Sequence, residues 1–152
     1  MSDLATPVHA IRPANARDAL ELSRLLTALG HPTAAESIVA RWEQWAAAGG
    51  AGLVAAHLDG TLLGLATVHR LVVLHRPRPV GRITALVVDA AVRRQGIGRA
   101  LVAAAEETLA RAGCGLLEIT SHVRRVDAHA FYERLGYERT GFRFAKMLVP
   151  VS

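Results

Sequence analysis

The stretch RRQGIGR, residues 93–99, combines residue types and spacing that are suited to binding an anion. It lies between an apolar run and an amphipathic helical pattern, and the first amides of a helix have no hydrogen-bond partner within that helix. The dipoles of these amides favour an anion. Gly96 and Gly98 have no side chains to cover them, and three arginines add positive charge. The stretch therefore predicts a phosphate-binding loop; the alternative is an ordinary glycine turn with solvated arginines.

Two familiar phosphate loops do not match this stretch. The nucleoside-triphosphate loop requires Gly-Lys followed by Ser or Thr, and the only lysine of the chain is Lys146. The dinucleotide fingerprint requires a third glycine three residues after the second, and Leu101 occupies that position. A phosphate would therefore be bound by a loop of another kind.

Positive charge is concentrated around the loop. Residues 70–99 contain seven arginines and a single acid, Asp89, which gives the segment a net charge of +6, whereas the whole chain carries +5. A local basic field indicates an anionic partner, either a phosphorylated small molecule or a nucleic acid. Nucleic acid is the less favoured partner and is not expected, because the sequence shows no recognition-helix pattern and has 5% aromatic residues for base stacking.

Length and composition fit one domain over residues 1–152, with 51% hydrophobic and 20% charged residues. The first residues are unlike a secretory signal, and no apolar run reaches the length of a membrane span. We therefore expect a cytoplasmic protein without a membrane partner. Cys114 is the only cysteine, which excludes an internal disulfide and a multi-cysteine zinc site. We expect no metal.

Two helices are predicted after a short N-terminal strand. Leucines at helical spacing form the first helix, with Asn15 as its N-cap. Thr33 and Glu36 form a capping box for the second. Trp42 and Trp45 lie on the apolar face of this second helix.

The rest of the chain predicts a mixed sheet. Asp59-Gly60 lies between two apolar runs and is typical of a hairpin. Residues 82–88 are mostly apolar on both faces, as in a central strand. After the loop come a helix closed by Gly113, a strand at 116–121, a short helix at 127–136 and a last strand at 141–148. The predicted order is β-α-α-β-β-β-α-β-α-β, in which the strands flanking the crossover helix should be parallel.

Two segments together resemble a known family. RRQGIG matches the Gln/Arg-x-x-Gly-x-Gly/Ala loop of the GNAT superfamily of acyl-CoA-dependent N-acetyltransferases, and it follows a segment similar to the family's fourth strand. HAFYERLGYERTGF, residues 129–142, is similar to the family's second hallmark. The resemblance implies the α/β GNAT fold, a mixed twisted sheet of six to seven strands with about four helices. It also implies direct transfer of an acetyl group from acetyl-CoA to an amine.

The resemblance further implies how coenzyme A is held. The pantetheine arm would pair with Leu86, Val87 and Val88, and the Val88 N–H would stabilise the developing oxyanion. The strands carrying Val88 and Leu116 would splay and leave unpaired groups for the cofactor. Arg125 occupies a position where the family often has Asn, and we expect it to contact a CoA phosphate instead. The pyrophosphate would be held by Arg93, Arg94, Gln95, Gly96, Ile97, Gly98 and Arg99.

The catalytic groups are less clearly marked. Tyr132 matches the family's tyrosine, so the resemblance makes it the acid that protonates the departing thiolate; core packing is the alternative. The family often has an acid on the fourth strand, where this chain has Thr84 and Ala85. Glu118 is the best replacement as a base, with a structural ion pair as the alternative, and His122 could relay a proton.

The acceptor amine is not marked by any motif. Trp42 and Trp45 are interpreted as core residues or as the lining of an acceptor site. A small amine and a protein amino group are both compatible with the sequence as the acceptor. The sequence also leaves open whether the chain forms a homodimer. Two other functions are also kept: an acyl-CoA-binding sensor without catalysis, and a basic nucleic-acid-binding module.

Overall fold

A computed structural model of the chain describes residues 9–120 and 126–150. By its internal contacts the chain divides into two units, Met1–Ile119 and Thr120–Ser152. The first unit contains all the described strands and the second contains the last helix. Among the residues that the structure describes, no helix is both long enough and apolar enough to cross a membrane.

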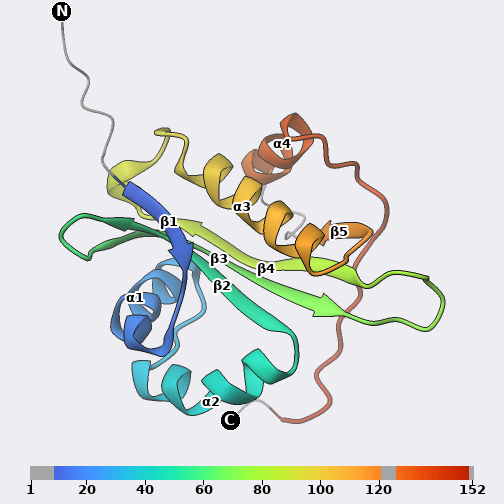
Figure 1. The fold of residues 1–152 in the computed structure, drawn as a ribbon, viewed down its shortest axis with the longest axis horizontal. Helices are drawn as coiled ribbons and strands as arrows, with labels where there is room; N and C mark the ends of the chain where they lie inside the picture. Colours follow the sequence, from blue (N-terminus) through green and yellow to red (C-terminus); the bar gives the residue numbers. More distant parts are fainter. Residues whose placement is uncertain (1–8, 121–125, 151–152) are drawn as a thin grey trace, which may run out of the picture. The chain divides into compact units, whose positions relative to one another are not determined.

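The first unit is built on one sheet with the strand order β1-β2-β3-β4-β5 (Figure 1). Neighbouring strands are antiparallel from β1 to β4, whereas β4 and β5 are parallel, as predicted for the crossover. The predicted hairpin is also confirmed: Gly60 has a φ of 91°, and Asp59 accepts the Thr61 N–H at 2.8 Å. The strands are β1 (His9–Pro13), β2 (Gly50–His57), β3 (Leu62–Leu71), β4 (Val80–Val88) and β5 (Leu116–Ile119).

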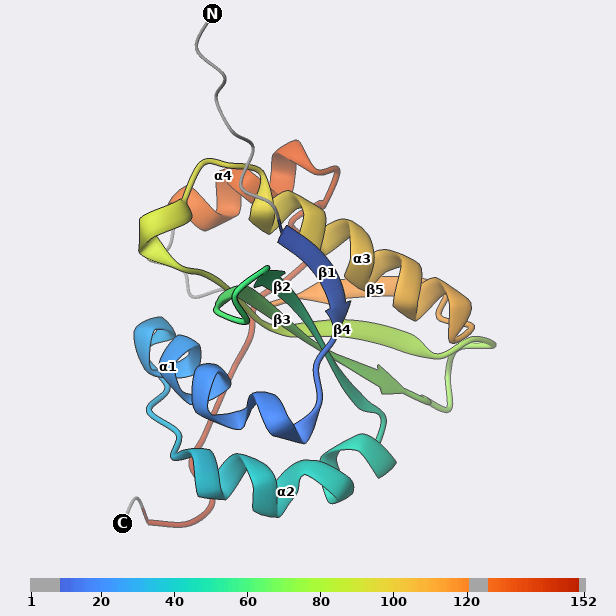
Figure 2. The ribbon, with the colours of Figure 1, turned by 60° about the vertical axis from the view of Figure 1, so that its left-hand side comes forward.

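Helices cover both faces of this sheet. α1 and α2 lie on one face and α3 lies on the other (Figure 2). Gly30 and Gly113 end α1 and α3 in the left-handed conformation, with φ of 102° and 88°, and for Gly113 this confirms the predicted helix end. The helices are α1 (Ala19–Leu29), α2 (Ala35–Ala47) and α3 (Ile97–Arg111).

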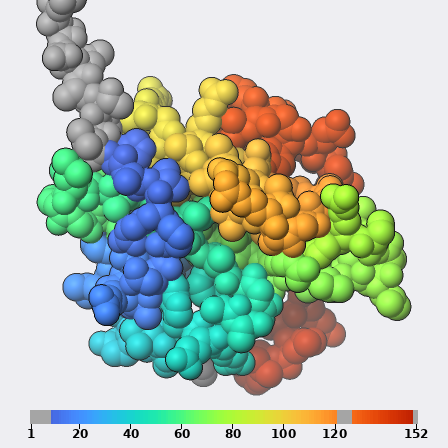
Figure 3. Space-filling view, in the orientation of Figure 1, coloured from blue at the N-terminus to red at the C-terminus, as the bar shows by residue number. Residues whose placement is uncertain are grey.

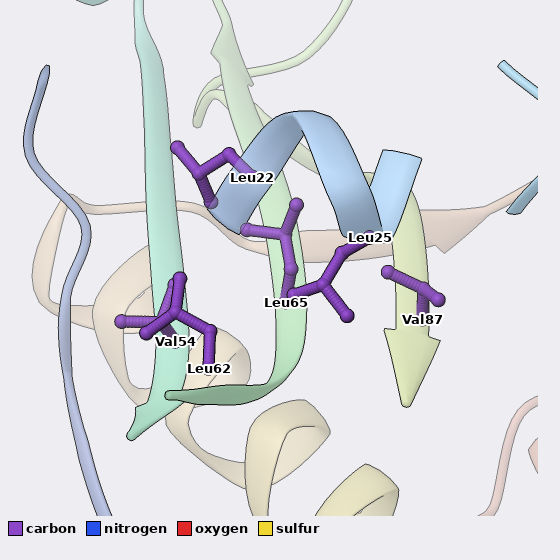
Figure 4. Close-up of a cluster of buried hydrophobic side chains, with 6 residues drawn as sticks. All are labelled: Leu22, Leu25, Val54, Leu62, Leu65 and Val87. Atoms are coloured by element: carbon purple, nitrogen blue, oxygen red, sulfur yellow. The ribbon is translucent and has the colours of Figure 1, made fainter. Parts of the chain in front are cut away.

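The core beneath α1 joins that helix to three strands. Leucines one turn apart on α1 point into the sheet, and every side chain of the cluster is at most 7% exposed (Figure 4). The end of β4 is part of this cluster, so α1 packs directly against the strand that leads to the loop. The cluster consists of Leu22, Leu25, Val54, Leu62, Leu65 and Val87.

On the opposite face, two glycines allow α3 to approach the sheet closely. A Cβ on Gly64 would lie 2.8 Å from Leu101 Cδ1, and a Cβ on Gly81 would lie 2.7 Å from Leu109 Cδ1. Both leucines are at most 3% exposed. A larger residue at either glycine would push α3 away, so these contacts fix the helix whose first turn follows the loop.

One predicted helix cap is confirmed and another is wrong. Asn15 accepts the Arg17 N–H at 2.9 Å and caps a 3-10 turn, Ala16–Asp18, that leads into α1. α2 begins at Ala35 with Ala34 as its N-cap, so the capping box of Thr33 and Glu36 does not form. Thr33 lies one residue too early for it, and its hydroxyl donates to the His31 carbonyl at 2.8 Å instead.

The second unit contains α4 (Val126–Arg134), which Gly136 follows with a φ of 92°. The predicted helix is thus confirmed. The strand predicted for residues 141–148 is wrong, because residues 137–147 have no regular structure and a bend follows them. Phe142 and Phe144 are 86% and 91% exposed. Alternating apolar residues form a strand only where the backbone finds a pairing partner, and the described part of the sheet therefore has five strands rather than six to seven.

Candidate active site

The predicted phosphate loop leaves the sheet at the end of β4. Asp89 follows the strand, donates its N–H to the Leu63 carbonyl at 2.8 Å, and accepts the Ala91 N–H at 3.0 Å. A 3-10 turn, Ala90–Val92, comes next, and α3 begins at Ile97. The loop is therefore held at both ends, by a carboxylate cap at its start and by the buried Ile97 side chain, 1% exposed, at its end.

The backbone of the loop has the features of an anion site. Arg94 has a φ of 66°, the only positive φ of a non-glycine among the described residues, and Gly96 has a φ of 80°. Gly96 is the N-cap of α3 and provides no side chain to its amides. The Ala100 N–H donates to the Gly96 carbonyl at 3.0 Å, at the start of the helical hydrogen bonds of α3. The amides of Ile97, Gly98 and Arg99 come before this bond and therefore have no acceptor within the helix. These amides are available to an anion.

The arginines of the basic segment form two groups. Arg70, Arg76, Arg78 and Arg82 lie near the start of β4, and the connection of residues 72–79 stands out from the first unit (light green in Figure 3). Arg93, Arg94 and Arg99 follow the other end of the strand, about 30 Å away for a strand of this length. The net charge of +6 therefore does not form one patch, which weakens the nucleic-acid alternative.

The loop arginines are free to act on a ligand. Arg93, Arg94, Gln95 and Arg99 are all exposed. None of the three arginines forms an ion pair with a residue that the structure describes. An anionic group at the loop amides would therefore meet three guanidinium groups that form no ion pair with a described acid.

The end of β4 has an edge that no described strand covers, called the open edge below. Its pairing with β5 covers only Val80–Ile83, so in the described ladder Leu86, Val87 and Val88 pair with β3 alone. Because the Asp89 N–H points to β3 and alternate residues of a strand point to opposite sides, the N–H groups of Leu86 and Val88 point toward the open edge. An extended ligand could pair with the strand there.

An ion-pair network joins α1 to this region. Arg24 binds Glu21 at 2.8 Å, Asp89 at 2.7 Å and the Leu62 carbonyl at 2.7 Å. Glu21 also accepts the Leu62 N–H at 3.0 Å. The hydrogen bond from Arg24 lowers the pKa of Glu21, and the Ala91 N–H together with Arg24 lowers the pKa of Asp89. Sequence reasoning missed Arg24, because only its spacing from Glu21 gave any local signal.

The candidate base has a partner on the neighbouring strand. Glu118 on β5 is in register with Arg82 on β4, and Arg82 Nε lies 3.1 Å from a Glu118 carboxylate oxygen. The ion pair that is the alternative to a catalytic base is therefore present. Thr84 forms a bulge in β4, where its hydroxyl lies 2.7 Å from that of Thr67 on β3.

The candidate acid lies on α4 in the second unit. The Tyr132 ring makes edge contacts with Phe131 and Tyr137, with centroids 5.5 and 6.3 Å apart, and it is half-buried. Its carbonyl accepts the Leu135 and Tyr137 N–H groups at the end of the helix. His122 and Arg125 lie outside the described residues.

A cavity of about 250 Å³ lies between α1, α2 and the sheet. Trp42 and Trp45 line it, with ring centroids 5.0 Å apart in an edge arrangement. Trp42 also packs against the α1 core, so its ring belongs both to the core and to the wall of this cavity. Within residues 9–120 and 126–150 no group of three or more His, Cys, Asp and Glu could hold a metal ion.

The family model and the two curated relatives that match this chain are acetyltransferases. The model of the acetyltransferase (GNAT) family matches residues 19–137. The aminoalkylphosphonate N-acetyltransferase of Salmonella typhimurium is 41% identical over 90 residues, which cover 59% of this chain and 58% of that protein. The chain thus spans less than two thirds of this relative. The aminoglycoside N(6')-acetyltransferase type 1 of Stenotrophomonas maltophilia is 34% identical over 133 residues, 86% of each protein.

Solved structures show the same fold. The aminoglycoside N-acetyltransferase AAC(6')-Iy, solved in complex with CoA, has a TM-score of 0.79 to this chain. The two are 20% identical, and the match covers 93% of this chain and 96% of that one. At this identity the likeness concerns the fold, and it agrees with the mixed α/β fold expected from the sequence.

Proposed function

This chain belongs to the acetyltransferase (GNAT) family, and from that membership we propose that it transfers an acetyl group directly from acetyl-CoA to the amino group of an acceptor. The observation that carries the proposal is the end of β4. An open strand edge there runs directly into a loop with uncovered helix amides and with arginines that have no ion-pair partner among the described residues. An extended arm that ends in a pyrophosphate matches this succession of groups.

The loop residues would hold coenzyme A mainly through the backbone. Their amides bind the pyrophosphate, and the exposed guanidinium groups add charge; the residues are Arg93, Arg94, Gln95, Gly96, Ile97, Gly98 and Arg99. Ile97 contributes its amide alone, because its side chain is buried. Leu86 and Val88 bind the pantetheine arm through groups at the open edge, and Val87 anchors the strand beneath α1.

Acetyl-CoA supplies a thioester carbonyl that the acceptor amine attacks. The Val88 N–H points to the open edge and donates to the carbonyl oxygen as that oxygen gains negative charge. Tyr132 gives its phenolic proton to the departing sulfur. Glu118, oriented by Arg82, takes the proton that the amine loses. The acceptor is bound in the cavity beside Trp42 and Trp45.

A single GNAT domain over residues 1–152 is part of the proposal. It is supported by the family match, which runs from residue 19 to residue 137 and so includes residues of both units.

Ligand binding and thiol release test the proposal in two steps. Acetyl-CoA and desulfo-CoA should both raise the melting temperature, because both contain the pyrophosphate. Release of the CoA thiol in the presence of amines should then follow. No response to any acyl-CoA at millimolar concentration would contradict the proposal, and binding without thiol release on a broad amine panel would favour the sensor.

A further inference from the structure

The cavity between α1, α2 and the sheet has a distinctive chemical lining. Most of its wall is apolar, from leucines of α1 and the two tryptophans of α2, and none of the lining residues within 9–120 and 126–150 is acidic. Among the lining residues that the structure describes, Arg41 is the only one with a charged side chain. Its volume of about 250 Å³ lies just below the ~300–1,000 Å³ of pockets for drug-sized ligands, which indicates a compact ligand.

The aromatic wall is fixed by the sheet. The Trp45 indole lies against β2 at Gly50, where a Cβ would come within 2.2 Å of Trp45 Nε1. Gly52, next on the same face, also lines the cavity, and its Cβ would lie 3.6 Å from the same ring. Both tryptophans are half-buried, so part of each ring is exposed. Such rings favour a flat apolar ligand.

Polar groups lie on two different elements around the cavity. Thr67 belongs to β3, and its hydroxyl contacts that of Thr84 at 2.7 Å, while Thr84 also lies within 3.2 Å of the Thr67 carbonyl. When Thr84 donates to that carbonyl and Thr67 donates to Thr84, the Thr67 oxygen keeps lone pairs for a ligand N–H. Thr67 is in register with Ala85 of β4, about 10 Å along the strand from Val88.

Arg41 supplies the second polar group, on α2. Its side chain is exposed and has no ion-pair partner within the part of the chain that the structure describes. It would attract an anionic group on the ligand and repel a second cation.

We propose that the acceptor is a compact primary amine with a flat apolar body and one anionic group. The inference rests on the proposed function. The amine lies at Thr67, toward the end of β4, the body lies against Trp42 and Trp45, and the anionic group pairs with Arg41. A polycationic acceptor is disfavoured, because the described lining residues offer it no carboxylate.

Four amines test this substrate class by CoA thiol release. L-Phenylalanine has all three features, and phenethylamine lacks only the carboxylate. 2-Aminoethylphosphonate lacks the apolar body, and kanamycin is a polycation. We expect L-phenylalanine to have the highest kcat/KM of the four, about tenfold or more above phenethylamine, as for a charge-assisted hydrogen bond.

Two arginine variants test the role of Arg41. Arg41→Gln should reduce the ratio of kcat/KM for L-phenylalanine over phenethylamine to about one. Arg111→Gln, which changes an exposed arginine at the end of α3, is the matched control and should keep the wild-type ratio. Circular dichroism confirms that both variants are folded.

The outcomes separate this inference from the proposed function. The inference is overturned if kanamycin or 2-aminoethylphosphonate has the highest kcat/KM of the four amines. It is also overturned if Arg41→Gln leaves the ratio of kcat/KM for L-phenylalanine over phenethylamine unchanged. In both cases the released thiol still supports acetyl transfer. If none of the four amines releases thiol, the inference is overturned as well. Calorimetry with acetyl-CoA then decides the proposed function, which falls if acetyl-CoA does not bind.

Discussion

Arg24 of α1 and Asp89 at the end of β4, 65 residues apart in the sequence, form an ion pair with 2.7 Å between Arg24 Nη1 and Asp89 Oδ2. The other Asp89 oxygen accepts the Ala91 N–H of the turn that leads into the phosphate loop. One carboxylate therefore links the helix that lines the cavity proposed for the acceptor to the loop that is proposed to bind coenzyme A.

Breaking this pair should loosen the loop. Arg24→Gln removes the positive charge of the pair. Asp89→Asn removes the negative charge but keeps an oxygen that can accept the Ala91 N–H. Because the Arg24 side chain is 42% exposed, we expect a coupling free energy of about 0.2–1 kcal/mol in a double-mutant cycle measured by urea unfolding. Acetyl-CoA affinity, measured by calorimetry, should fall by about two- to fivefold in each single variant. Strictly additive effects on stability would contradict a direct interaction.

The same network makes stability depend on pH. Hydrogen bonds lower the pKa values of Glu21 and Asp89 in the folded state, with Arg24 the largest cause for Glu21 and the Ala91 N–H for Asp89. A carboxylate with a depressed folded pKa contributes stability that is full above its unfolded pKa, about 3.9–4.3, and is lost as the pH falls through the folded pKa. The urea concentration at the midpoint of unfolding should therefore decrease as the pH is lowered below about 4. The fall should be smaller in Arg24→Gln, and an identical pH profile in that variant would count against the network.

The order of elements could be predicted from the sequence because its signals are local. Helical spacing of leucines, the Asp59-Gly60 turn and the helix-ending glycines each act within a few residues. The phosphate loop was predictable for the same reason. Thr33 shows the limit of such signals, since a helix start shifted by one residue removed a capping box that the spacing favoured.

Features that depend on distant partners could not be predicted. Nothing near Arg24 in the sequence indicates Asp89. The cavity likewise depends on how α2 lies on β2, with the Trp45 ring at Gly50. Residues 141–148 alternate like a strand but have no regular pairing in the structure, because a strand is defined by its neighbour and not by its own pattern.

Filling the loop should abolish cofactor binding without unfolding the chain. In Gly98→Leu the new side chain would project toward the phosphates and cover the first amides of α3. Leucine is a good helix former, so α3 should persist. Ala103→Leu places the same side chain at an exposed position on the same helix and should bind acetyl-CoA normally. Calorimetry and circular dichroism provide the comparison, and normal binding by Gly98→Leu would make the loop assignment wrong.

Removing the phenol of Tyr132 should affect turnover and not binding. Tyr132→Phe keeps the ring contacts with Phe131 and Tyr137 but loses the proton for the thiolate. We expect kcat to fall about a hundredfold while the acetyl-CoA Kd is unchanged. Tyr137→Phe is the matched control and should keep most of the activity. Wild-type turnover by Tyr132→Phe would mean that the tyrosine is packing and that water protonates the thiolate.

Glu118 and Arg82 allow a base to be distinguished from a structural ion pair. Glu118→Gln and Arg82→Gln both break the 3.1 Å contact between β4 and β5, so a purely structural pair predicts equal effects on activity and stability. An alkylammonium is only on the order of one part in a thousand neutral near pH 7, so loss of a base should be costly. If Glu118 is the base, Glu118→Gln should lower kcat/KM about a hundredfold, and Arg82→Gln should lower it far less. The loss of kcat/KM in Glu118→Gln should also become smaller as the pH rises, because more of the amine is then neutral without a catalytic base. Steady-state rates of both variants between pH 6 and about 9 measure this difference, and parallel profiles would assign Glu118 to the ion pair alone.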